Sequence, residues 1–259
     1  MTDTLLPLAL GGVAVSAAMC ALWLVQRRTN NAGIVDVAWS AAIGCLALFY
    51  AAWPAGPPRM RMLVAFMFGL WSIRLTIHLY RRVVGKPEEG RYASLRRDWG
   101  DAHDAKMFVF YQFQAFAAWV FAAPALAICR SQPPAAWLAA TSLGLWILGI
   151  LGVALSDRQL AQFKTLADSS GKTCRRGLWR YSRHPNYFFE WVHWLSYVPL
   201  AAGDAYWWMP ALVAAALLYL VLFVTGIPPT ERQAVASRGD DYREYQRTTS
   251  AFVPWFTTS

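Results

Sequence analysis

Seven apolar stretches, each close to the length of a membrane-spanning helix, constrain the fold of this chain more than any other feature. They are Leu5–Val25, Ile34–Trp53, Met62–Tyr80, Met107–Cys129, Ala136–Leu155, Tyr187–Ala202 and Tyr206–Ile227. A helix needs about 20 predominantly apolar residues to cross a bilayer, and the sixth stretch is the shortest and the most polar. The sequence therefore predicts an all-α, multi-pass membrane bundle of seven helices, folded as a single domain over residues 1–259.

The composition agrees with this interpretation. Apolar residues make up 57% of the chain and charged residues 15%, whereas soluble chains have about 45–50% and 25%. The net charge of +9 comes with 14 tryptophans, which favours basic membrane loops over a nucleic-acid partner. The four cysteines form no CxxC pair and the four histidines show no ligand spacing, so we expect neither a disulfide framework nor a metal site.

The basic residues predict an orientation. Twenty of the 24 Lys and Arg residues lie in segments that share one side of the membrane if the N-terminus is outside, and such segments are usually cytoplasmic. The first stretch lacks a preceding basic residue and precedes Arg27, so it is predicted to be a retained helix and not a signal peptide. Two inside loops, 81–106 and 156–186, are predicted to fold over the cytoplasmic end of the bundle, and residues 228–259 are predicted to form an inside tail whose segment 240–247 is an amphipathic helix.

The strongest local motif is the segment Arg180–Glu190, which leads into the sixth stretch. Pro185 suits the first turn of a helix, and the free N–H groups of a helix N-terminus attract phosphate. Arg183 and His184 add cationic donors at that point, although lipid headgroups would also hold them there. Further along the same face come Glu190 and His193, together with Trp194 and Tyr197. Ionisable groups inside a membrane helix indicate function.

A second group of polar residues lies on the second and third stretches. Asp36 precedes Trp39 by about one helical turn, and Arg74 precedes His78 in the same way. Asp36 and Arg74 form either a structural ion pair or part of a polar cavity that polarises a substrate oxygen. In the first inside loop, Arg91 beside Tyr92 is a candidate phosphate ligand, whereas Arg96 and Arg97 suit a solvated or lipid-facing surface equally well.

Several of these segments together resemble a known family. They are Ser156–Asp157, Gly177–Tyr181, Asn186–Tyr187 with Glu190, Gly226–Pro228 with Glu231, Tyr242–Tyr245 and Val253–Pro254. The chain resembles the bacterial branch of the steroid 5-alpha reductase family over nearly its whole length, most strongly from Leu143 to Phe256. The Arg-His-Pro-Asn-Tyr segment is also similar to one in sterol reductases, and its Arg-His-Pro core is similar to one in isoprenylcysteine and phospholipid methyltransferases.

The resemblance implies a seven-helix reductase in the bacterial inner membrane. Such an enzyme takes NADPH from the cytoplasmic side and reduces the 4,5 double bond of a 3-oxo-4-ene steroid. Asp157, Asn186 and Glu190 match family cofactor contacts, and Lys164 stands where the steroid enzymes usually have Arg. Arg91 matches a basic position near the cofactor, and Asp36 aligns with the substrate-polarising Glu.

This sequence departs from the family at two places. The tyrosine that partners the substrate-polarising Glu in the animal enzymes aligns here near Trp71. The Arg and His of the animal enzymes' last helix are replaced by the region Gly226–Pro229, with Glu231 and Arg232 nearby. Both departures concern the substrate more than the hydride chemistry, so steroid specificity is less firmly implied than reduction.

Motifs and resemblance together give a set of candidate site residues. The catalytic candidates are Asp36, which would donate to the substrate carbonyl if protonated, and His78. The substrate-binding candidates are Trp39, Trp71 and His193. The cofactor-binding candidates are Arg74, Arg91, Asp157, Lys164, Lys172, Arg183, His184, Asn186, Tyr187, Glu190 and Glu231.

The expected function is NADPH-dependent reduction of a steroid or similar lipophilic enone by hydride transfer. Asn186 and Glu190 would orient the nicotinamide amide. Membrane lipid is the other expected partner, without an obligate protein partner. Two alternatives remain: a membrane methyltransferase that uses S-adenosylmethionine, and a non-enzymatic lipid-binding protein or scaffold, which would leave Asp36 and Glu190 without a role.

Overall fold

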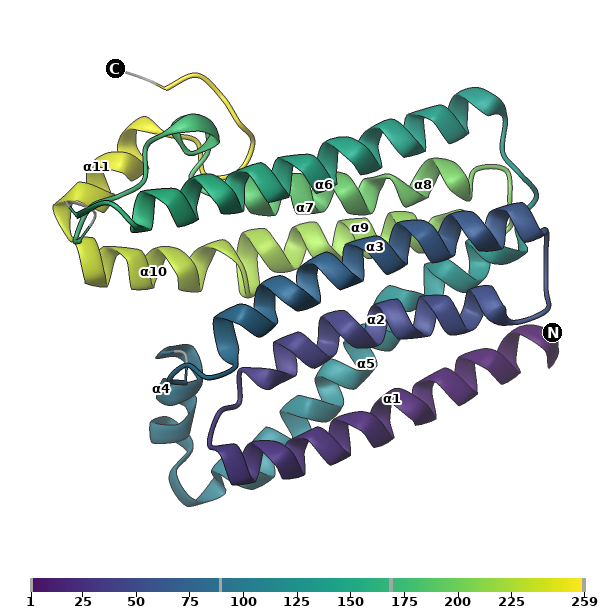
Figure 1. Cartoon of the computed structure of the whole chain (residues 1–259), viewed down its shortest axis with the longest axis horizontal. Helices are drawn as coiled ribbons and strands as arrows, with labels where there is room; N and C mark the ends of the chain where they lie inside the picture. The colour runs from purple at the N-terminus through teal and green to yellow at the C-terminus, as the bar shows by residue number, and fades with distance from the viewer. Residues whose placement is uncertain (1, 89, 168–169, 258–259) are drawn as a thin grey trace. The chain divides into compact units, whose positions relative to one another are not determined.

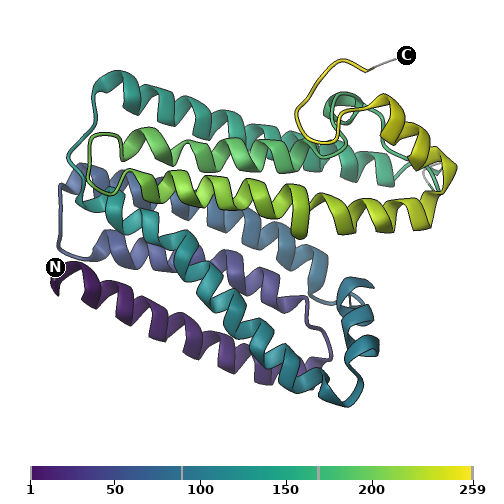
Figure 2. The ribbon, with the colours of Figure 1, turned by 180° about the vertical axis from the view of Figure 1, so that it is seen from behind.

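The computed structural model describes residues 2–88, 90–167 and 170–257, and within these ranges it contains helices and no β-strand. The predicted all-α class is therefore confirmed. The chain divides into two compact units, Met1–Pro133 and Pro134–Ser259. The two views in Figures 1 and 2 show that each unit consists mainly of helices. The prediction that both form one membrane domain stays a prediction.

The first unit is built from four long helices and a short one. In chain order its elements are α1 (Thr2–Thr29), α2 (Ile34–Ala52), α3 (Pro58–Val83), α4 (Gly90–Trp99), the 3₁₀ turn η1 (Gly100–Ala102) and α5 (His103–Arg130). Helix α2 packs against α3 and α5, and α1 packs against α5. The short α4 lies at the end of the unit where the α1–α2 and α3–α4 links meet (Figure 1).

Small residues allow α2 and α3 to approach closely. A Cβ atom on Gly44 would lie 2.2 Å from the Ser72 hydroxyl oxygen, so only glycine fits there without displacing α3. The Ser72 hydroxyl donates to the Ser40 carbonyl oxygen at 2.8 Å, and the Ser40 and Thr76 hydroxyls are 2.9 Å apart. Close backbone approach and hydroxyl hydrogen bonds are the usual means by which helices associate in a lipid environment.

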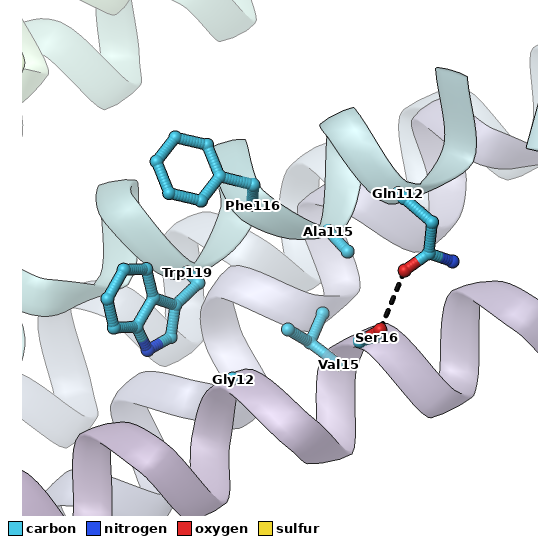
Figure 3. A pocket seen from close by; sticks show the side chains of 7 residues that line it. All are labelled: Gly12, Val15, Ser16, Gln112, Ala115, Phe116 and Trp119. Atoms are coloured by element: carbon cyan, nitrogen blue, oxygen red, sulfur yellow. Dashed lines mark hydrogen bonds between the residues drawn. The ribbon is translucent and has the colours of Figure 1, made fainter. Parts of the chain in front are cut away.

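A small groove marks the packing of α1 against α5 (Figure 3). It has a volume of about 260 Å³ and is lined by Gly12, Val15, Ser16, Gln112, Ala115, Phe116 and Trp119. The Ser16 hydroxyl donates to the Gln112 side-chain oxygen at 2.6 Å, and the Trp119 indole donates to the Leu8 carbonyl oxygen at 2.8 Å. None of the predicted site residues lines this groove, so its polar contacts serve to hold α1 on α5.

The second unit also consists of helices. In chain order its elements are α6 (Ala136–Lys164), the 3₁₀ turn η3 (Gly177–Arg180), α7 (Pro185–Leu195), α8 (Tyr197–Leu200), α9 (Trp208–Tyr219), the π-helical turn η4 (Leu220–Val224), α10 (Ile227–Arg238) and α11 (Asp240–Thr248). Helix α7 packs against both α6 and α9. The links before η3 and after α11 lie at the same end of this unit (Figure 2).

Six segments in the described part of the chain are long and apolar enough to cross a membrane. The stretch predicted as the sixth of seven spans is instead divided into α7 and α8, although Ser196 between them keeps right-handed helical angles. As one continuous helix, the sixteen residues from Pro185 to Leu200 would extend roughly 24 Å, which is short of the hydrocarbon thickness of about 30 Å. The seventh span and the N-outside orientation therefore stay predictions.

The predicted inside loops contain more helix than the sequence indicated. Helix α6 continues to Lys164 and does not end at Leu155, so the predicted loop 156–186 begins with nine helical residues. Hydropathy marks the end of an apolar run, but the following Gln, Leu, Ala and Lys residues are good helix formers and carry the helix onward. Loop 81–106 contains α4. The predicted amphipathic tail helix is confirmed as α11, with Tyr242 and Tyr245 buried.

Candidate functional site

In the first unit, Asp36 meets a tyrosine from a distant part of the sequence. The Tyr92 hydroxyl donates to Asp36 Oδ1 at 3.0 Å, and Tyr92 is only 1% exposed. Asp36 lies in the first turn of α2 and is half-buried, while Tyr92 lies in the first turn of α4. A carboxyl group oriented by a buried hydroxyl can exchange a proton with a bound oxygen.

Glu88 joins the two elements that carry this pair. Its carboxylate accepts a hydrogen bond from the backbone N–H of Ala32 at 2.9 Å, and Ala32 lies four residues before Asp36. It also accepts two hydrogen bonds, at 3.1 and 3.2 Å, from Arg96, which lies four residues after Tyr92. Although burial opposes it, hydrogen bonds from the Arg96 guanidinium and the Ala32 N–H hold the pKa of Glu88 below its usual range. Glu88 thus fixes the start of α2 beside α4.

The link between α1 and α2 is also held by Asn31. Its side-chain nitrogen donates to the carbonyl oxygens of Val83 and Lys86 at 3.3 and 3.2 Å, and its oxygen accepts the Gly33 N–H at 3.1 Å. A cavity of about 460 Å³ lies along this link and is lined in part by Asn31 and Glu88. Because both the nitrogen and the oxygen of the Asn31 side-chain amide already have hydrogen-bond partners, Asn31 serves to hold this link in place.

We expect Glu88→Gln to lower the melting temperature at neutral pH, because the amide keeps the shape of the carboxylate but loses its charge beside Arg96. A carboxylate whose pKa is lowered by folding contributes stability that is complete above its unfolded pKa and is lost as pH falls through its folded pKa. The difference between wild type and variant should therefore shrink as thermal unfolding is repeated from pH 7 toward pH 3. A difference independent of pH would contradict this role, and the exposed Glu244→Gln serves as the control.

The other candidates of the first unit have varied surroundings. Trp39 is half-buried with its ring edge-on to Phe121 at 5.5 Å, and its indole nitrogen is buried without a hydrogen-bond partner among the described residues. Arg74 is half-buried, His78 is exposed and Trp71 is fully buried. Arg91 lies on α4, but its side chain is outside the described part of the structure. The predicted roles of all these residues stay predictions.

In the second unit, one face of α7 carries the acceptors expected for a cofactor amide. Pro185 occupies the first turn of α7, as predicted, and places Asn186 and Glu190 one turn apart. The Asn186 side-chain oxygen is buried and, within the described residues, has no hydrogen-bond donor. Glu190 accepts the Trp194 indole N–H at 3.3 Å, and its carboxylate is 3.9 Å from His193 Nδ1. The predicted shared face of Glu190, His193, Trp194 and Tyr197 is thus confirmed.

Three of the predicted cofactor ligands contact one another: Arg183, His184 and Glu231. Glu231 Oε1 accepts from Arg183 Nε at 2.6 Å and is 3.2 Å from His184 Nε2. Arg183 Nη1 also donates to the carbonyl oxygens of Thr249 at 2.5 Å and Gln246 at 3.0 Å. With side chains only 4–14% exposed, these three residues form a buried charge cluster that links α10 to the start of α7.

The C-terminal tail completes this link. The Arg183 N–H donates to the Ser250 carbonyl oxygen at 2.8 Å, and the Ser182 hydroxyl donates to that of Phe252 at 2.8 Å. The Tyr245 hydroxyl donates to the carbonyl oxygens of Trp179 and Ser182. Burial raises the pKa of Tyr245, so this hydroxyl remains a donor at every physiological pH. The tail therefore holds the segment that precedes α7.

The remaining candidates of the second unit lie around this segment. The rings of His184 and Tyr187 stack at 5.2 Å, and the Tyr187 hydroxyl is 3.3 Å from that of Thr230. Asp157 is half-buried on α6, whereas Lys164 and Lys172 are exposed. Their predicted contacts with a cofactor stay predictions.

Two of the residues that shape the site are not predicted from the sequence. Tyr92 enters the predictions only as the neighbour of Arg91, and Glu88 does not enter them. The only local signal for Tyr92 is its place in the Gly-Arg-Tyr segment that opens α4. Glu88 contacts residues 56 positions earlier and 8 later, and spacing alone gives no sign of the first of these contacts.

The long apolar helices of the described residues define a multi-pass helical membrane protein. A family model described as "Protein of unknown function (DUF1295)" matches residues 22–249, and the chain belongs to this family. No curated protein and no solved structure matches the chain.

Proposed function

We propose that this chain is an NADPH-dependent reductase that acts on the carbon–carbon double bond of a lipophilic conjugated enone, such as a 3-oxo-4-ene steroid. The observation that carries the proposal is the pair of acceptors on α7. The buried Asn186 oxygen lacks a donor among the described residues, and Glu190 follows it by one turn. A primary carboxamide offers two N–H donors, and two acceptors one turn apart suit them.

The nicotinamide ring of NADPH carries such a carboxamide, and when bound the cofactor supplies a hydride for the β-carbon of the enone. Asn186 and Glu190 would hold the amide and so fix the orientation of the ring. Cofactor enzymes depend on the protein for this positioning and for electrostatic stabilisation. The resemblance of the chain to the steroid 5-alpha reductase family supports the same assignment.

Asp36 and Tyr92 would act on the other reactant. Hydride addition to an enone moves negative charge onto the carbonyl oxygen, and a hydrogen-bond donor placed there lowers the barrier. Because Tyr92 donates to Asp36 Oδ1, the carboxyl group is held in one orientation. Asp36, in its protonated form, would donate to the carbonyl oxygen, and a proton from water completes the saturated ketone.

The proposal is tested by NADPH binding to the purified protein and to Glu190→Ala. Hydrogen bonds to a charged group contribute about 1.5–3 kcal/mol, so the variant should bind NADPH roughly 10- to 100-fold more weakly. An NADPH analogue with a carboxylate in place of the carboxamide should bind the wild type weakly for the same reason.

Glu244→Ala on the exposed side of α11 is the matched control and should leave the affinity unchanged. Equal affinity of wild type and Glu190→Ala for NADPH would contradict the role of Glu190. Binding of S-adenosylmethionine without binding of NADPH would favour the methyltransferase alternative.

A further inference from the structure

A row of buried polar side chains lies where α7 and α8 pack against α6. His193 and Tyr197 are 0% exposed and Trp146 is 5% exposed. A Cβ atom on Gly149 of α6 would lie 2.6 Å from the backbone nitrogen of His193, so the glycine brings α7 close to α6. Polar groups buried this deeply are costly unless they are hydrogen-bonded to one another.

The hydrogen bonds in this row have a direction. His193 Nε2 lies 2.9 Å from the Tyr197 hydroxyl oxygen, and Nδ1 of the same ring faces the Glu190 carboxylate. An ionised carboxylate can only accept, whereas a tyrosine hydroxyl can donate. The two neighbours therefore favour neutral His193 with its hydrogen on Nδ1 and with Nε2 accepting from Tyr197.

The Nδ1 atom of His193 faces Glu190. Its distance to Glu190 Oε1 is 3.9 Å, which is longer than a hydrogen bond, but an N–H dipole directed at a carboxylate is strongly favourable in a low-dielectric interior. The same oxygen accepts the Trp194 indole N–H at 3.3 Å. Two N–H groups thus converge on one oxygen of Glu190.

We propose that Tyr197 and His193 are positioning residues that hold Glu190 as an oriented acceptor: Tyr197 fixes His193 as the Nδ1–H tautomer, and His193 presents that N–H to the Glu190 carboxylate. This role deepens the proposed function, on which it rests, because an acceptor-only Glu190 selects a ligand group that donates. In this role both residues act on NADPH through Glu190.

The tautomer is measured directly by NMR on the purified protein labelled with ¹⁵N-histidine, without any ligand. The His193 signals are assigned by their loss in His193→Asn. We expect protonated Nδ1 and unprotonated Nε2 in the wild type, and loss of this fixed tautomer in Tyr197→Phe, which removes only the hydroxyl. Protonated Nε2 in the wild type would overturn the inference.

The effect on Glu190 is measured by NADPH titration of two matched variants. Asn places its amide nitrogen near the position of Nδ1, whereas the longer Gln places it near Nε2. We expect His193→Asn to bind NADPH with nearly wild-type affinity and His193→Gln to bind it about tenfold more weakly. Equal losses in the two variants would overturn the positioning role.

The two measurements also separate this inference from the proposed function. Failure of the wild type to bind NADPH would contradict the reductase, whereas the NMR result supports or overturns the tautomer on its own.

Discussion

Asp36→Ala is expected to lower the turnover number about 10²- to 10³-fold while leaving the affinity for NADPH nearly unchanged. Loss of one well-placed donor to a developing oxyanion has an effect of this order. The proposed NADPH contacts are on α7, whereas Asp36 is on α2 and bonds to Tyr92 of α4, so binding and chemistry should separate. The measurement is NADPH consumption with a 3-oxo-4-ene steroid, beside a direct NADPH titration.

Two further variants calibrate the Asp36 result. Tyr92→Phe keeps the carboxyl group but removes the hydrogen bond that orients it, so we expect a smaller loss of about tenfold. Asp104→Ala removes a more exposed carboxylate paired with Arg27 at 2.9 Å and should leave turnover unchanged. Normal turnover by Asp36→Ala would remove this residue from the mechanism.

Glu231→Ala should have the largest effect on stability. It leaves the Arg183 guanidinium, whose side chain is 11% exposed, beside buried His184 without their shared carboxylate. Breaking a buried ion pair by removing one partner costs about 3 kcal/mol or more, and the Tyr242 hydroxyl and the Gln246 side chain also lose a hydrogen-bond acceptor. We expect thermal unfolding to shift downward by several degrees.

The matched control for Glu231→Ala is Asp240→Ala. Asp240 also pairs with an arginine, Arg243, at 2.7 Å, but their side chains are 93% and 57% exposed. Exposed pairs contribute little, so the melting temperature should stay unchanged. If the two alanine variants unfolded at the same temperature, the Arg183–His184–Glu231 cluster would not be the stabilising link that the distances indicate.

The long apolar stretches were predictable because a helix that crosses lipid must be apolar along most of its length. The same criterion gave the wrong end for α6, since the helix continues through the polar residues to Lys164. The same criterion did not predict the division between α7 and α8. Ser196, which separates them, has ordinary helical backbone angles.

The candidate site was predictable where its residues lie close together in the sequence with helical spacing. Glu190, His193, Trp194 and Tyr197 follow from helical spacing, and their contacts are confirmed. The pairing of Asp36 with Tyr92 was not predictable, because 56 residues separate them. Helical periodicity shows which residues share a face of one helix, but it does not show which distant segments contact each other. The contacts of Glu231 with Arg183 and His184 also join distant parts of the sequence. The sequence therefore predicts Glu231 as a cofactor ligand and does not predict these contacts.

The central claim is that this protein transfers hydride from NADPH to a conjugated enone. It is tested most directly by incubating the purified protein with NADPH deuterated at the transferable position of the nicotinamide ring and a 3-oxo-4-ene steroid, then analysing the product by mass spectrometry. The account predicts a saturated ketone that carries one deuterium at the former β-carbon. Unchanged steroid from a protein that binds S-adenosylmethionine and not NADPH would contradict it.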